Sequence, residues 1–444
     1  MNRLQRFTGG AFFGGRTFTS LRAHYNYRLY FSGQFLSLIG TWLQSAAMAW
    51  LVLELTHSAF AVGVLTFCQF GTYLVLGLFG GAISDRLDHR KTLIATQIAL
   101  ALCSTLMAVL TLMGVITVWE ACLVAAMRGS ILVMNNPSRQ AFLFQMVGRK
   151  ELPNAIALNS SLANATRILG PGIGGLLIAA FGVGVCFTID ALSYVAVVVA
   201  MLLMRVDELL PAEQRRQPSL LRGIGEGFAY VFQTATIWIA LLIFLCICTA
   251  SINFNVLLPL VASNTLGAGA QIYGLLTACF GAGALIGALT SASLGRASWP
   301  VLLIGAAGFG TSEILLAFQH SVIGAVLFLL ATGIFYTLYT SNTNSIVQLA
   351  TPRYLQGRVA GLYSYIFSAS NAPGSLLAGT LADVGGTQLA FLVAGGTALL
   401  GAAFGLTRLR STARRRVETG PLSGELNALR EVERSELAEK QPEV

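Results

Sequence analysis

Charged residues are scarce in this sequence. Only 11% of its 444 residues are Asp, Glu, Lys or Arg, whereas 55% are hydrophobic. In a soluble globular chain about a quarter of the residues are charged, so the composition excludes a soluble enzyme. The sequence therefore predicts a protein that lies in a lipid bilayer.

Features that would indicate an enzyme or an ATP-driven pump are also missing. The sequence has no Gly-x-x-x-x-Gly-Lys-Ser/Thr loop, and its four histidines fall at the ends of apolar segments or in loops, without a nucleophile or metal cluster beside them. All seven cysteines lie inside apolar segments, where we interpret them as small packing residues. We expect no enzyme activity, no cofactor and no metal site.

Twelve long apolar segments occupy most of the chain. Most are about 20 residues long, which is the length a helix needs to cross ~30 Å of hydrocarbon. Continuous apolar runs favour helices over the alternating strands of a barrel. The fold class predicted is an all-α membrane protein with twelve transmembrane helices. The predicted spans are 30–54, 59–84, 91–115, 118–140, 155–181, 183–204, 236–262, 271–294, 299–318, 321–348, 356–383 and 387–407.

Lys and Arg residues lie on one side of these spans. They precede the first span and follow each even-numbered span, whereas the turns at 54–58, 182–184 and 319–321 contain none. The positive-inside rule then places both termini in the cytoplasm of a cell with the protein in its inner (plasma) membrane. The net charge of +9 is explained by these topological anchors, and we expect no nucleic-acid partner.

A polar insertion divides the spans six and six. The halves echo each other weakly, as where Gly63-Val-Leu-Thr66 recurs as Gly274-Leu-Leu-Thr277. Two similar six-helix halves that face each other across a central cavity are typical of secondary transporters. The predicted divisions are an N-terminal segment 1–28, a first half 29–204, a central loop 205–235, a second half 236–407 and a tail 408–444, with both end segments and the loop in the cytoplasm.

The turn after the second span carries six ionisable side chains, more than a turn needs. Its sequence is Gly81-Ala-Ile-Ser-Asp85-Arg86-Leu-Asp88-His89-Arg90-Lys91. Gly81 allows a close helix approach, Asp85 places an anion at the helix end, and Arg86, Arg90 and Lys91 supply donors. We interpret the turn as a cytoplasmic gate. The alternative is that the cations anchor the topology and Asp85 neutralises them.

Four segments resemble the major facilitator superfamily, and within it the branch of enterobactin exporters and related secretion effectors. They are 81–91, Arg128 in Met-Arg-Gly129, 137–141 (Pro-Ser-Arg-Gln-Ala) and 152–175. The first is similar to the signature Gly-x-x-x-Asp-Arg-x-Gly-Arg-Arg/Lys, from which it departs at Asp88 and His89. The resemblance implies that Asp85 meets the N-terminus of the eleventh span and latches the halves together on the cytoplasmic side.

Four charged residues lie deep inside predicted spans, where each costs a few kcal/mol (~2.5 or more) unless it is paired or hydrated. They are Arg128, Arg167, Asp190 and Glu313. Arg128 matches an arginine of the proton-coupled exporters of the family, which implies a role in coupling or substrate contact. A carboxylate that exchanges between a desolvated setting and a nearby arginine can carry protons. Alternatively, each arginine has a structural partner, and Asp190 neutralises one of them.

Glycine and proline mark expected bends in the fifth and eleventh spans, at Gly170, Pro171, Gly174, Gly175 and Pro373. Dinucleotide binding by the glycine run is excluded because no strand precedes it. We expect Pro171 to kink its helix and the glycines to allow close packing at the interface of the halves.

Polar residues in apolar settings are candidates for the wall of a central cavity, and amides among aromatic rings suit an amphipathic organic ligand. We therefore expect a monomeric secondary exporter of a siderophore, drug or metabolite, working by alternating access and proton antiport. An importer or facilitator, and a membrane receptor or scaffold without transport, are the alternatives. The cavity candidates are Gln34, Gln44, Gln69, Asn135, Asn255, Tyr336 and Asn342.

Overall fold

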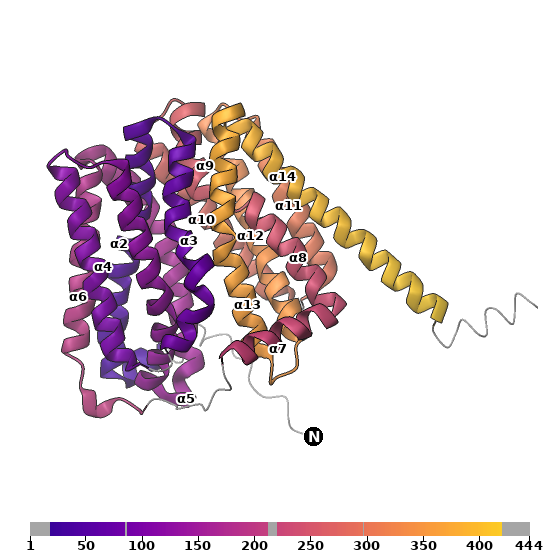
Figure 1. Ribbon diagram of the computed structural model, residues 1–444, viewed down its shortest axis with the longest axis horizontal. Helices are drawn as coiled ribbons and strands as arrows, with labels where there is room; N and C mark the ends of the chain where they lie inside the picture. Colours follow the sequence, from indigo (N-terminus) through magenta and orange to yellow (C-terminus); the bar gives the residue numbers. More distant parts are fainter. Residues whose placement is uncertain (1–17, 85–86, 212–219, 296, 420–444) are drawn as a thin grey trace, which may run out of the picture.

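The computed structural model describes residues 18–84, 87–211, 220–295 and 297–419. Figure 1 shows two groups of helices side by side, α1 to α6 in indigo to magenta and α7 to α14 in rose to yellow. The first group comprises α1 (Thr19–Ala23), α2 (Tyr25–Thr56), α3 (Ala59–Ser84), α4 (His89–Leu112), α5 (Val118–Phe181) and α6 (Val183–Leu202).

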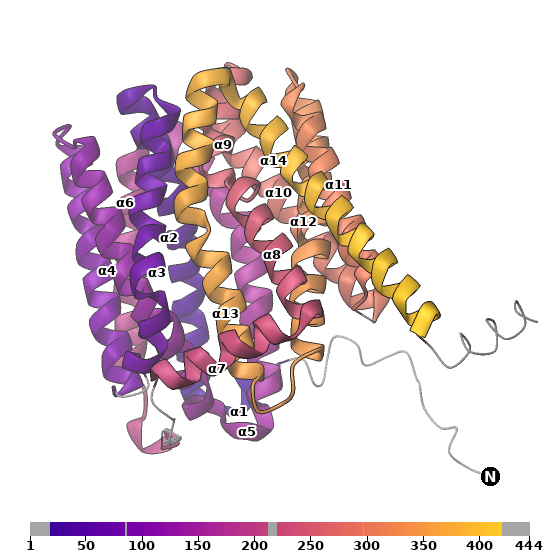
Figure 2. The ribbon, with the colours of Figure 1, turned by 45° about the vertical axis from the view of Figure 1, so that its right-hand side comes forward.

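The second group follows the central loop. Its helices are α7 (Leu220–Gln233), α8 (Ala235–Ala250), α9 (Phe254–Leu260), α10 (Ala270–Leu294), α11 (Trp299–Ala317), α12 (Val322–Leu349), α13 (Gln356–Ala369) and α14 (Asn371–Thr419). In Figure 2, α7 crosses the lower end of this group, where it packs against α8 and α13. We call the end of the bundle where α2 begins and α7 lies the proximal end, and the opposite end the distal end.

Ten helical segments in the described ranges are long and apolar enough to cross a membrane. Two of these contain a reversal and therefore cross twice. Gly148 in α5 (φ 68°, ψ 176°) and Gly386 in α14 (φ 69°, ψ 179°) adopt left-handed backbone that glycine tolerates without steric cost. With both reversals the chain makes twelve crossings, so the predicted twelve-helix fold is confirmed.

The seventh crossing is broken rather than continuous. Its first part, α8, ends at Ala250, and α9 resumes at Phe254 before a π-helical turn, Val261–Thr265. The side-chain amide of Asn253 donates a hydrogen bond to the backbone carbonyl of Thr249 at 2.8 Å. Pro259 has no backbone N–H and therefore cannot donate to the carbonyl of Asn255. Irregular backbone at membrane depth is tolerated when protein surrounds it, and residues 251–254 are buried.

Buried apolar residues divide into clusters whose arrangement differs between the two ends. The largest cluster joins both halves, and near the distal end it includes Trp50, Val62, Leu257, Tyr273 and Phe391. At the proximal end each half has its own cluster. Tyr27, Tyr30, Phe142 and Met201 belong to that of the first half, and Val231, Ile237, Val347 and Val359 to that of the second. The halves therefore share a core at the distal end and pack separately at the proximal end.

Candidate functional site

Glycines line the seam between α5 of the first half and α10 of the second. A Cβ atom at Gly175 would lie 2.4 Å from the carbonyl oxygen of Ala270, and one at Gly274 would lie 2.6 Å from that of Pro171. Such distances leave no room for a side chain, so the two backbones touch. The close packing expected of the glycine run at the interface of the halves is thus present at Gly175.

A second seam joins α3 to the first part of α14, and at its distal end the side chain of Asp383 binds the start of α3. Asp383 accepts hydrogen bonds from the backbone amides of Ala59 at 2.8 Å and Phe60 at 3.1 Å, and from the Ser58 hydroxyl at 3.1 Å. These amides form the N-terminus of α3, where an anion is favoured by the helix dipole. The sequence shows Asp383 at a span end, but gives no signal for its partner in the other half.

The structure describes only part of the predicted cytoplasmic gate. Asp85 and Arg86 lie outside the described residues, and Gly81 belongs to α3. Asp88 caps α4 by accepting from the amide of Lys91 at 3.0 Å, and the guanidinium of Arg90 donates to the carbonyl of Met201 at 2.7 Å. This part of the loop ties α4 to the end of α6 within one half, and its contact with the eleventh span stays a prediction.

Arg128 and Asp190 form an ion pair inside the first half. Arg128 Nη1 lies 3.2 Å from Asp190 Oδ2, with side chains 2% and 0% exposed. Ser104 accepts from Arg128 at 2.7 Å and donates to Asp190 at 2.6 Å. The Tyr194 hydroxyl accepts from Arg128 Nη2 at 3.1 Å. The pair therefore joins α4, α5 and α6, and each charge has a charge-assisted partner.

Sequence reasoning missed the polar residues around this pair. Tyr194 follows Asp190 by one helical turn, a spacing that places both on one face of α6, so its position was a usable signal. Ser104 on α4 gave none. Gly40 on α2 leaves the space that Asp190 and Ser193 occupy. A Cβ atom at this position would lie 2.9 Å from Asp190 Oδ1 and 2.5 Å from Ser193 Oγ.

Glu313 on α11 lies in the second half without a counter-charge among the described residues. It is 0% exposed, and it is the only Asp, Glu, Lys or Arg between residues 297 and 352. The hydroxyl of Ser251 lies beside it, but that hydroxyl donates to the carbonyl of Ala394 at 2.7 Å. Neither carboxyl oxygen has a hydrogen-bond partner among the described residues.

Arg167 on α5 differs from Arg128 in having no acidic partner in the described part of the chain. Its Nε atom is buried and makes no hydrogen bond there. Its Cζ atom lies 5.8 Å from the centre of the Trp42 ring on α2. The structure therefore does not bring the four deep charged residues together; it pairs two and leaves two separate.

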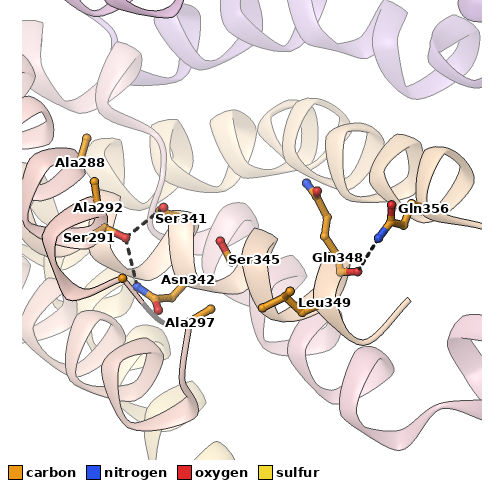
Figure 3. A pocket seen from close by; sticks show the side chains of 11 residues that line it. Ala288, Ser291, Ala292, Ala297, Ser341, Asn342, Ser345, Gln348, Leu349 and Gln356 are labelled. Atoms are coloured by element: carbon orange, nitrogen blue, oxygen red, sulfur yellow. Dashed lines mark hydrogen bonds between the residues drawn. The ribbon is translucent and has the colours of Figure 1, made fainter. Parts of the chain in front are cut away.

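A pocket of about 510 Å³ lies at the proximal end of the second half, between α10, α12 and α13. Figure 3 shows Ser291 hydrogen-bonded to Ser341 and Asn342, with Gln348 and Gln356 further along the wall. Its lining residues are uncharged. Of the predicted cavity residues, Asn342 lines this pocket.

The other cavity candidates are dispersed. Asn135 donates to Thr96 at 2.8 Å, and Gln44 donates to the Met48 sulfur at 2.8 Å. Gln34 and Tyr336 are buried, Gln69 is half-buried and Asn255 is exposed. Of the predicted bends, Pro171 stays inside α5, whose non-helical residue is Gly148 instead, and Gly170 packs on Trp42 while Gly174 packs on Leu43. Pro373 follows the boundary between α13 and α14 at Ser370.

Relatives of known name cover most of the chain. A staphyloferrin A transporter of Staphylococcus aureus is 24% identical over 374 residues, 83% of this chain and 92% of that one. A macrolide efflux protein A of Streptococcus pyogenes is 25% identical over 369 residues, 82% and 91% of the two chains. An enterobactin exporter of Escherichia coli is 26% identical over 375 residues, 81% and 86% of the two chains.

Solved structures with the same fold are transporters as well. The nucleoside transporter NupG matches with a TM-score of 0.69 at 14% identity, over 86% of this chain and 98% of that one. A bacterial homologue of the lysosomal transporter Spinster, in an inward-facing conformation, matches with a TM-score of 0.70 at 12% identity, over 88% and 98% of the two chains. The transmembrane secretion effector family matches residues 16–424. The chain therefore belongs to this family of multi-pass membrane transporters of the major facilitator superfamily, and it is not an enzyme.

Proposed function

We propose that this protein is a secondary active exporter that moves an amphipathic small molecule out of the cytoplasm by alternating access and proton antiport. The observation that carries the proposal is the shared apolar core at the distal end beside separate cores at the proximal end. Halves packed in this way separate at one end while they stay joined at the other. The efflux and export functions in the names of two relatives support the direction.

The proximal end faces the cytoplasm in this proposal. It carries Arg149, Lys150, Arg205, Arg353 and Arg408, whereas the distal turns at 54–58, 113–117 and 182–184 contain no Lys or Arg. Short loops on the cytoplasmic side of a membrane carry an excess of Lys and Arg. The separate cores then lie on the side from which an exporter takes its substrate.

Two latches hold opposite ends of the antiparallel pair formed by the second and eleventh crossings. At the distal end, Asp383 caps the N-terminus of α3. In the opposite state, with the proximal end closed, the predicted cytoplasmic gate of Gly81, Asp85, Arg86, Arg90 and Lys91 would latch onto the N-terminus of the eleventh crossing. Opening one end breaks one latch and forms the other.

Glu313 carries the coupling proton. A buried carboxylate without a cation costs several kcal/mol (~3 or more), and the protonated acid avoids this cost. Asp190, in contrast, is matched by Arg128, so this pair is assigned to holding the first half together during transport. A proton therefore enters with Glu313 when the distal side opens and leaves when the group is hydrated from the cytoplasm.

The test is transport into inside-out membrane vesicles with an imposed pH gradient. Siderophores, macrolides and cationic dyes are screened as substrates. Uptake is expected to need an acidic vesicle lumen. E313Q is expected to reduce accumulation about tenfold or more. Exchange of labelled for unlabelled substrate should persist in this variant. The matched control is E208Q, because Glu208 is an exposed proximal carboxylate.

Three results would contradict the proposal in different ways. Uptake that survives collapse of the pH gradient excludes proton antiport. Full accumulation by E313Q excludes Glu313 as the proton carrier. Accumulation only in right-side-out vesicles indicates an importer or facilitator of a small metabolite instead.

A further inference from the structure

Arg167 is a cation near the middle of the bilayer that has no anionic partner in the described part of the protein. It lies 14 residues before the distal end of α5 at Phe181, a rise of about 21 Å at ~1.5 Å per residue. Neither a carboxylate nor a hydrogen-bond acceptor in the described ranges engages its buried Nε atom. A guanidinium at this depth is unfavourable unless it is paired or hydrated. The site therefore favours an incoming anion.

The position of Arg167 is fixed by the seam between the halves. A Cβ atom at Gly281 of α10 would lie 3.2 Å from the Arg167 carbonyl oxygen, so the backbone here touches the second half. The side chain extends towards Trp42, with Cζ 5.8 Å from the ring centre. It also lies within electrostatic range of the Tyr336 hydroxyl on α12. Trp42 of the first half therefore lies beside this positive charge, and Tyr336 of the second half is close enough to interact with it electrostatically.

Aromatic rings extend from this charge into the second half. Tyr336 lies 5.4 Å from Phe280 and 5.9 Å from Phe309, measured between ring centroids, and Phe254 lies 4.4 Å from Phe280. Phe254, Phe309 and Tyr336 are buried, whereas Phe280 is half-buried, so Phe280 is the ring of this cluster that offers apolar surface to a ligand. A ligand that reaches both Arg167 and Phe280 needs a negative group at one end and an apolar body at the other.

We propose that Arg167, supported by Trp42, binds the anionic group of the transported molecule, and that the substrates are amphipathic organic anions such as aryl carboxylates. The inference rests on the proposed export function and names its substrate class. Guanidinium binds carboxylate through two parallel hydrogen bonds, while the Trp42 ring holds the cation in place. Arg128 cannot do this, because Asp190 and Ser104 already occupy it.

Binding to purified full-length protein tests the substrate class directly. The probes are 1-naphthaleneacetate and its neutral isostere 1-naphthaleneacetamide, titrated by thermal-shift measurement in a non-ionic detergent. The wild type is expected to bind the carboxylate at least about tenfold more tightly, since a hydrogen bond to a charged group contributes ~1.5–3 kcal/mol. R167Q is expected to remove this preference, and R167K to keep part of it.

The matched control is R205Q, because Arg205 is an arginine at the exposed proximal surface and its removal should leave the preference intact. R167K also guards against misfolding, since it preserves the charge. Equal binding of both probes by the wild type, no saturable carboxylate binding, or a preference retained in R167Q overturns the inference. Export of a cationic dye by the wild type, without export of the aryl carboxylate, overturns it too and leaves the proposed export function standing. Carboxylate preference without vesicle transport contradicts only the export function.

Discussion

At the residue scale, the charged residues inside the membrane-spanning helices follow two patterns. Arg128 and Asp190 neutralise each other's charge, whereas Arg167 and Glu313 remain without a counter-charge among the described residues. A satisfied pair adds little net stability, but each member becomes costly when its partner is removed. The unsatisfied groups are costly already, and such cost is retained at sites that bind or exchange something.

Removal of Arg128 alone should destabilise the protein strongly. R128M leaves Asp190 buried without a cation, at a cost of about 3–5 kcal/mol. The double variant R128M/D190L should recover most of that loss, because two apolar side chains replace the pair. The measurement is the melting temperature of the purified protein in detergent.

R205M is the control for that experiment, because the Arg205–Glu208 pair is exposed at 63% and 46% and exposed pairs contribute at most about 1 kcal/mol. A double variant that is no more stable than R128M would show that the pair is not an isolated charge-balanced unit.

At the scale of helices, the seams depend on small residues and on one acid. Glycines allow α5 to touch α10 and α3 to touch α14, and Asp383 binds the first amides of α3 across the distal end. Helix association in a membrane relies on such close packing because lipid competes equally for apolar side chains. A single capping acid can therefore shift the balance between two states of the bundle.

Substitution of Asp383 should open the distal end. D383N removes the charge that favours the N-terminus of α3, a loss of about 0.3–1 kcal/mol. The two halves should then spend more time apart there. The measurement is the spin-label distance between positions 113 and 323, whose native Met113 and Ile323 are 67% and 76% exposed, in a background without native cysteines.

E120Q provides a matched control. Glu120 also binds a backbone amide at a distal helix start, that of Thr117 at 2.8 Å, but within its own half. It should leave the distance distribution unchanged. A D383N distribution identical to that of the parent protein would rule out Asp383 as a distal latch.

At the scale of the whole molecule, the twelve crossings and the distribution of cations make a prediction about orientation. Cysteine introduced at Phe318, at the distal end and 53% exposed, should react with a membrane-impermeant maleimide in intact cells. Cysteine at Tyr354, at the proximal end and 78% exposed, should react only after permeabilisation, because the positive loops stay inside. Reaction of position 354 in intact cells would reverse the orientation and the proposed direction of export.

The sequence by itself determined that the protein lies in a lipid bilayer, how many helices cross it and where the turns between them fall. These depend on local hydropathy and on the lengths of apolar runs, which a helix in lipid must obey whatever its neighbours are. Even the reversal at Gly148 lies between two predicted spans, although α5 is one helical element in the structure. The break in the seventh crossing was not anticipated, although Ser251, Asn253 and Pro259 interrupt the apolar run there and are residues that can compete with helical hydrogen bonds.

Only the tertiary structure decided which buried polar groups meet. Arg128 and Arg167 look equivalent in sequence, at similar depth in adjacent spans, yet one faces Asp190 and the other faces Trp42. Helices that are apolar on nearly every side carry no pattern that reports which face meets which neighbour. Asp383 likewise reaches α3 across more than 300 residues of chain. Partners of this kind are set by the packing of the two halves, and the unpaired charges that we assign to substrate and proton become visible only when that packing is known.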